Sequence, residues 1–193
     1  MDSQMRDFQG QNTVSILFRI RHTLNDQNLL LNVGPMIPAS WGATPHDAPA
    51  PKNRNIQGNM LFDTGATGIG IDESVAGRLG LQPLPQREAV HGLGGKHSLN
   101  VYNATLFLPV EPVRAIGNLQ PGANALIGFP LPVHGIVGLQ ANHEAHNLRA
   151  PNGLPVIGIL GRLFLQFTRF TYDGLSGNLV IEVDESIRHP RKG

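Results

Sequence analysis

The sequence predicts a mainly β protein with a closed architecture and only one or two short helices. The chain of 193 residues contains 23 glycines and 15 prolines, a large supply of turn-forming residues. Apolar and polar residues alternate over 14–21, as expected for a half-buried strand. Near the other end, 167–172 and 178–183 are rich in β-branched and aromatic residues and flank a turn, which predicts a hairpin. Short strands joined by many turns favour a barrel.

The other elements follow from local patterns in the same way. Further short strands are expected at 29–33, 60–62, 102–108 and 156–161, and a hairpin tip at 91–95.

A helix is expected to begin after Asp72, which is a suitable N-cap, and to stop at Gly80. Residues 162–167 are expected to add one or two helical turns.

The length fits a single domain, 1–193, with its core at about 14–183. Five prolines and no periodicity predict a Pro-rich surface loop at 34–58. Residues 109–153, rich in Gly, Pro, Asn and His, are expected to form an irregular insertion, and 184–193 a polar tail.

Composition excludes several classes of function. A net charge of +1 gives no electrostatic sign of a nucleic-acid partner, and the absence of cysteine excludes disulfides and a thiol nucleophile. The sequence has neither an apolar leader nor a stretch of about 18 apolar residues, so we expect no membrane partner and a cytoplasmic location.

Residues 61–66, Leu-Phe-Asp-Thr-Gly-Ala, carry the clearest chemical pattern. They predict that a carboxylate, Asp63, lies at the end of a strand in a tight bend of small residues. Thr64 is expected to hydrogen-bond across the bend, and Gly65 lets the backbone approach closely. A carboxylate held in this way suits acid–base hydrolysis. Taken alone, the triplet Asp-Thr-Gly fits an ordinary turn equally well.

Four segments together resemble the retropepsin-like aspartic peptidases, over roughly 60–108 and 155–183. Residues 62–81 resemble the catalytic loop and the helix after it, and 90–95, Val-His-Gly-Leu-Gly-Gly, are similar to the glycine-rich flap. The segment Ile-Gly-Ile-Leu-Gly-Arg-Leu-Phe-Leu resembles the family's apolar-Gly-Arg strand and C-terminal helix, and the terminal hairpin resembles that of bacterial members.

The chain departs from the family at Thr67 and Leu163, where acidic residues are frequent, so Arg162 needs another partner.

The resemblance implies a closed retropepsin-like acid-protease barrel and an aspartic endopeptidase without metal or cofactor. Because each chain has one such aspartate, it implies a homodimer in which two Asp63 carboxyl groups share a proton and activate water against a peptide substrate. The residues implied are Asp63, Thr64 and Gly65 for catalysis, and Ala66, Gly92, Leu93, Gly94, Gly95 and Ile159 for substrate binding.

Two alternatives remain open. The first is a non-catalytic binding or dimerisation module that keeps the retropepsin fold. The second is a zinc-binding hydrolase that uses His134, His143 and His146. His143 and His146 are spaced i, i+3, however, whereas the helical zinc motif needs i, i+4, so loop histidines are the simpler interpretation.

Overall fold

The computed structural model describes residues 16–23, 34–43, 55–92, 95–139 and 152–184. These residues form a mainly β fold with two short helices, as predicted. The strands are β1 (Ile16–Thr23), β2 (Met36–Ala43), β3 (Ile56–Phe62), β4 (Ile69–Asp72), β5 (Arg87–Gly92), β6 (Gly95–Pro112), β7 (Ala125–Ile136), β8 (Val156–Leu160), β9 (Thr168–Asp173) and β10 (Asn178–Asp184). The helices are α2 (Glu73–Leu79) and α4 (Arg162–Leu165).

Six of the strands close into a barrel in the order β2-β3-β8-β4-β7-β6, and β6 pairs back with β2. The pairs β3–β8 and β4–β7 are parallel, and the other pairs of the barrel are antiparallel. Closure leaves these six strands without a free edge. Fully buried side chains from these strands, among them Trp41, Met60, Ile71, Leu106 and Leu160, belong to one hydrophobic cluster. The predicted closed barrel is therefore confirmed, and it is compatible with a retropepsin-like fold.

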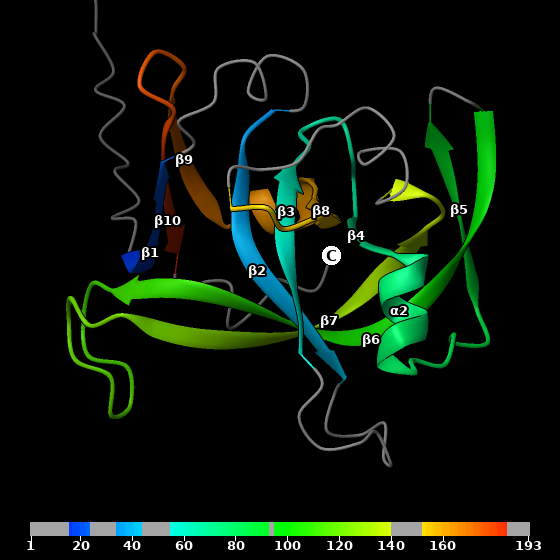
Figure 1. The fold of residues 1–193 in the computed structure, drawn as a ribbon, viewed down its shortest axis with the longest axis horizontal. Helices are drawn as coiled ribbons and strands as arrows, with labels where there is room; N and C mark the ends of the chain where they lie inside the picture. The colour runs from blue at the N-terminus through cyan, green and yellow to red at the C-terminus, as the bar shows by residue number, and fades with distance from the viewer. Residues whose placement is uncertain (1–15, 24–33, 44–54, 93–94, 140–151, 185–193) are drawn as a thin grey trace, which may run out of the picture.

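Strand β6 connects the barrel to the rest of the sheet. Its first residues form a hairpin with β5, its middle pairs with β7 and β2, and its end pairs with β1. Beyond β1 the sheet is extended by β10 and then by β9, the last of the described strands in the sheet order. Figure 1 shows the β5–β6 hairpin at one side of the molecule and the β1–β10–β9 sheet at the opposite side.

Helix α2 begins and ends where its caps predict. Asp72 Oδ1 accepts a hydrogen bond from the Ser74 amide at 2.8 Å, and Gly80 adopts the left-handed conformation with φ 72°. Val75, Ala76 and Leu79 form the buried face of the helix.

The predicted surface loop at 34–58 is wrong over 36–43 and 56–58. Residues 36–43 form β2, which pairs with β3 on one side and β6 on the other, and 56–58 begin β3. Nearly every side chain of β2 is buried, so no alternation of apolar and polar residues exists to reveal a strand. Pro38 costs this strand one amide donor only.

The predicted irregular insertion at 109–153 is also wrong in part, since β6 extends to Pro112 and β7 occupies 125–136. Pro130 and Pro132 lie within β7, opposite Thr105 and Asn103. Proline normally argues against a strand interior. Here the long pairing with β6 supplies the other backbone hydrogen bonds, which no local pattern in the sequence records.

The other strands and helical turns that the sequence predicts are confirmed among the described residues. The strands at 16–20, 60–62, 102–108 and 156–160 and the terminal hairpin are present, and α4 supplies the expected helical turn. The strand expected at 29–33, the hairpin tip at 93–94 and the polar tail from 185 onward lie outside the described residues. No helix in the described part of the chain is long and apolar enough to cross a membrane.

Candidate active site

The segment 63–68, called the Asp63 loop below, joins β3 to β4 (Figure 1). Backbone hydrogen bonds hold it to the end of β8 and the start of α4. The Asp63 amide donates to the Leu160 carbonyl at 3.1 Å. In return, the amides of Arg162 and Leu163 each donate at 2.9 Å, to the carbonyls of Ala66 and Thr67 respectively. Three hydrogen bonds across about 100 residues of sequence therefore fix the path of this bend.

The two oxygens of the Asp63 carboxylate differ in their hydrogen bonds. Oδ1 accepts hydrogen bonds from the amides of Gly65 at 2.8 Å and Ala66 at 3.2 Å. Within the described residues no hydrogen bond reaches Oδ2, and the side chain is half-buried. A side chain at position 65 would place its Cβ 3.0 Å from Oδ1, so glycine, which has no Cβ, suits this position. The geometry presents an oriented carboxylate with one oxygen available to water or to a second carboxyl group.

The expected hydrogen bond of Thr64 across the bend is not present among the described residues, and Thr64 is exposed. Instead, the side chain of Arg162 forms hydrogen bonds with the Asp63 loop. Its guanidinium donates to the Thr67 hydroxyl at 2.9 Å and to the Thr64 carbonyl at 3.4 Å. The partner that Arg162 needed is thus a hydroxyl and a carbonyl of the Asp63 loop rather than a carboxylate.

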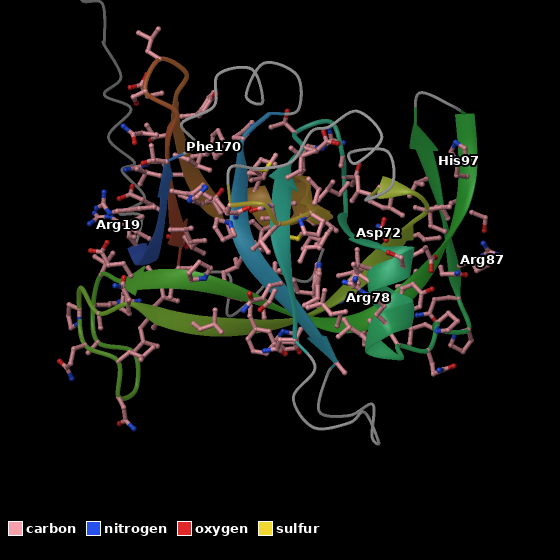
Figure 2. The ribbon with its side chains drawn as sticks, viewed as in Figure 1. Arg19, Asp72, Arg78, Arg87, His97 and Phe170 are labelled. Carbon is pink, nitrogen blue, oxygen red and sulfur yellow. The ribbon has the colours of Figure 1, made fainter. Side chains whose placement is uncertain are left out.

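The connection between β5 and β6 at the tip of their hairpin is short. Gly92 pairs with Gly95, which leaves a two-residue connection, Leu93 and Gly94, outside the described residues. Figure 2 shows Arg87 and His97 on this hairpin, on the side of the molecule away from Arg19.

The base of the hairpin is tied to the first turn of α2. The Glu73 carboxylate accepts hydrogen bonds from the Tyr102 hydroxyl at 2.5 Å and the Asn100 side-chain amide at 3.1 Å. Burial, and then the hydrogen bond to Glu73, raise the pKa of the Tyr102 hydroxyl above its usual value, so Tyr102 stays a donor. This network fixes β6 where it leaves the barrel.

Ile159 lies on β8 between the two strands that flank the Asp63 loop. It is half-buried, and its backbone is opposite Leu61 of β3 and Gly70 of β4. Ala66 is likewise half-buried, within the loop itself. Both residues therefore lie on elements adjoining Asp63, whereas Leu93 and Gly94 of the hairpin tip lie outside the described residues.

Residues 52–114 match the family model described as aspartyl protease. The matched segment contains the Asp63 loop, α2 and the β5–β6 hairpin. The match supports an aspartic peptidase family for this chain. No match was found among curated proteins.

An aspartic peptidase needs two carboxylates, and two other aspartates of this chain are engaged elsewhere. Asp72 caps α2. Asp173 closes the β9–β10 turn, where its carboxylate accepts hydrogen bonds from the Ser176 hydroxyl at 2.6 Å and the Leu175 amide at 3.0 Å. The Ser176 hydrogen bond is the main cause that lowers the pKa of Asp173.

The zinc alternative gains no support from the part of the chain that the structure describes, which contains no group of three metal-ligating side chains. His134 lies on β7 and contacts Glu88 of β5. His143 and His146 lie outside the described residues.

Sequence reasoning missed two contacts beside the site. The first joins Glu88 to His134, and the second packs the ring of Phe62, which precedes Asp63, against Phe170 of β9 at a centroid distance of 5.4 Å. Both join segments far apart in the sequence, so no local pattern signals either one.

Proposed function

We propose that this protein is an aspartic endopeptidase that acts as a homodimer, with Asp63 from each subunit forming the catalytic dyad. The carrying observation is the Asp63 carboxylate itself, whose Oδ1 is fixed by two amides while Oδ2 remains open in the described residues. The aspartyl protease match over this segment supports the same class of activity.

The proposed mechanism is general acid–base catalysis by the pair. Two carboxyl groups at close range cannot both ionise, so the dyad shares one proton. The ionised carboxylate takes a proton from water as the water oxygen attacks the peptide carbonyl carbon. The protonated carboxyl group donates its proton to the carbonyl oxygen, which gives a tetrahedral intermediate. The tetrahedral intermediate then breaks its C–N bond: the dyad protonates the leaving nitrogen and takes a proton from one hydroxyl of the intermediate, so that a carboxylic acid forms and the dyad again holds one shared proton. Because the two groups titrate together, neither role belongs to a fixed subunit.

The homodimer is supported by the surface around the Asp63 loop. Leu163 of α4 is 51% exposed and Phe170 of β9 is 38% exposed, and both lie beside the elements that hold the loop. Among the described strands β9 is the last of the sheet, so one of its sides has no strand partner within the described residues. Exposed apolar side chains next to an open strand edge suit contact with a second copy of the chain.

The proposed substrate is an extended peptide with large hydrophobic side chains at the cleaved bond. Ala66 and Ile159 would contact it from the barrel side, and the β5–β6 hairpin, with Gly92, Leu93, Gly94 and Gly95 at its tip, would cover it as a flap. Glycines at such a tip allow the backbone to approach a bound peptide closely.

Asp63→Asn tests the proposal, because the amide preserves the shape of the carboxylate but cannot accept the proton of water. Hydrolysis of a peptide with Phe on both sides of its central bond is measured at mildly acidic pH. Wild-type protein should cleave it, and the variant should show only background hydrolysis with an unchanged unfolding transition. A folded variant that retains more than a few per cent of wild-type activity would exclude Asp63 as the catalytic group.

A further inference from the structure

His134 lies where the barrel meets both the Asp63 loop and the β5–β6 hairpin. Its backbone on β7 is opposite Gly70 of β4 on one side and Val101 of β6 on the other. Strand β4 leads out of the Asp63 loop, and β6 forms one arm of the hairpin. One residue of the barrel thus adjoins two segments that the proposed function brings to the substrate.

The imidazole of His134 lies between the two segments. Nε2 forms a hydrogen bond with the carboxylate of Glu88 on β5. Because a carboxylate only accepts, Nε2 carries the proton in this contact. At the other edge of the ring, a Cβ added to Gly68 of the Asp63 loop would lie 2.4 Å from Nδ1. The ring therefore fits between Glu88 and Gly68, and the absence of a side chain at position 68 makes the room.

Glu88 attaches the outer arm of the hairpin to the barrel. Within the described residues β5 pairs with β6 alone, and the Arg87 guanidinium donates to the Ser98 carbonyl inside the hairpin. The Glu73 network holds only the β6 arm. The His134 side chain is 17% exposed and that of Glu88 is 61% exposed, so the contact has a fixed barrel end and a solvent-facing hairpin end.

We infer that His134 is a positioning residue, which fixes the β5–β6 hairpin relative to the Asp63 loop through Glu88 on one side and Gly68 on the other. The role in catalysis rests on the proposed function, since it requires the hairpin to cover the substrate. The attachment itself does not.

Hydrogen exchange of the protein without peptide tests the attachment directly. Glu88→Ala should increase exchange of amides in 87–92 and 97–101 by about 2- to 5-fold, the size expected for losing a partly exposed ion pair. Glu88→Gln, which can still accept the hydrogen bond, should restore most of the protection. Glu111→Ala, which breaks the Arg21–Glu111 ion pair (3.0 Å) at the far end of β6, is the matched control and should leave the hairpin unchanged. Equal hairpin exchange in wild type and Glu88→Ala would overturn the inference.

A second experiment tests the link from His134 to the Asp63 loop. Gly68→Ala in the wild-type background should displace the ring and increase hairpin exchange. In a His134→Ala background the same substitution should add nothing, since the obstructing ring is absent. An increase of the same size in both backgrounds would contradict the link. Should His134→Ala fail to fold, Gly68→Ala combined with Glu88→Ala gives the same comparison.

Kinetics separate positioning from simple loss of structure. Ordering a loosened hairpin over the substrate costs binding free energy, so Glu88→Ala should raise KM for the same peptide about 2- to 5-fold with little change in kcat. Unchanged KM alongside faster exchange would overturn the catalytic role. If wild-type protein cleaves no peptide, the proposed function fails, and hydrogen exchange alone decides the attachment.

Discussion

Gly161, at the end of β8, leaves no room for a side chain against the Asp63 loop. A Cβ at this position would come 2.1 Å from the Gly68 carbonyl oxygen and 2.7 Å from that of Ala66. Both atoms belong to the backbone, so neither can move away as a flexible side chain would. The backbone of Gly161, with φ −90° and ψ −170°, is open to any residue, and the requirement for glycine is therefore steric alone.

Gly161→Ala is expected to destabilise the fold by about 1–3 kcal/mol, the usual cost of forcing an extra methyl group into a packed site. It should also lower peptide hydrolysis, because the loop that carries Asp63 must shift. Chemical denaturation measures the first effect.

Gly77→Ala is the matched control. Gly77 lies within α2, and a Cβ added there would meet no neighbouring atom within 4 Å. Alanine at this position should therefore stabilise the folded protein by about 0.5–1 kcal/mol. Equal effects of the two substitutions would contradict the packing argument.

At the scale of the element, β1 carries a half-buried histidine, and we expect it to make the stability of the outer sheet depend on pH. His22 is opposite Leu179 of β10, and burial lowers its pKa below the ordinary value of 6.5. The unfolded chain therefore binds a proton here more readily than the folded chain does. Stability from this group is fully present above about pH 6.5 and is lost as pH falls through the lower folded-state pKa.

His22→Gln should remove this contribution and flatten the fall in unfolding free energy between about pH 8 and about pH 5. Urea denaturation at both pH values measures the change. His97→Gln serves as the control, since His97 is an exposed histidine on the hairpin. A wild-type pH dependence in His22→Gln would show that burial of this ring does not control acid stability.

At the scale of the whole molecule, the proposed site needs a second carboxylate besides Asp63. Asp72 and Asp173 serve a helix cap and a turn, so symmetry offers the simplest source of the second carboxylate. A two-fold axis between two Asp63 loops would bring the carboxylates together and cover Leu163 and Phe170 at the same time.

Activity per subunit should therefore fall on dilution below the dissociation constant of the dimer. Mixing wild type with a nine-fold excess of Asp63→Asn subunits should leave each wild-type subunit about tenfold less active, because most pair with the variant. The same excess of Asp173→Asn, which keeps Asp63, should not suppress activity. A fully active species that sedimentation shows to be monomeric at every concentration would contradict the homodimer.

The sequence by itself determined the features that depend on neighbouring residues. The caps at Asp72 and Gly80 were predicted correctly because capping is a contact within one turn. The bend at Asp63 was predicted from an apolar strand that runs into small residues. The Asp63 carboxylate indeed accepts hydrogen bonds from the backbone amides of Gly65 and Ala66, two and three residues further along the chain. The β-branched and aromatic residues and the turn that predicted the terminal hairpin are equally local features.

Only the tertiary structure decided which distant segments meet. Burial on both faces removed from β2 the alternation by which a strand is recognised, and pairing with β6 made a regular strand of a segment that contains Pro130 and Pro132. The contacts of Arg162 with Thr67 and of Glu88 with His134 join residues 95 and 46 positions apart. Their energies depend on distances set by the closed barrel, so no pattern of adjacent residues carries that information.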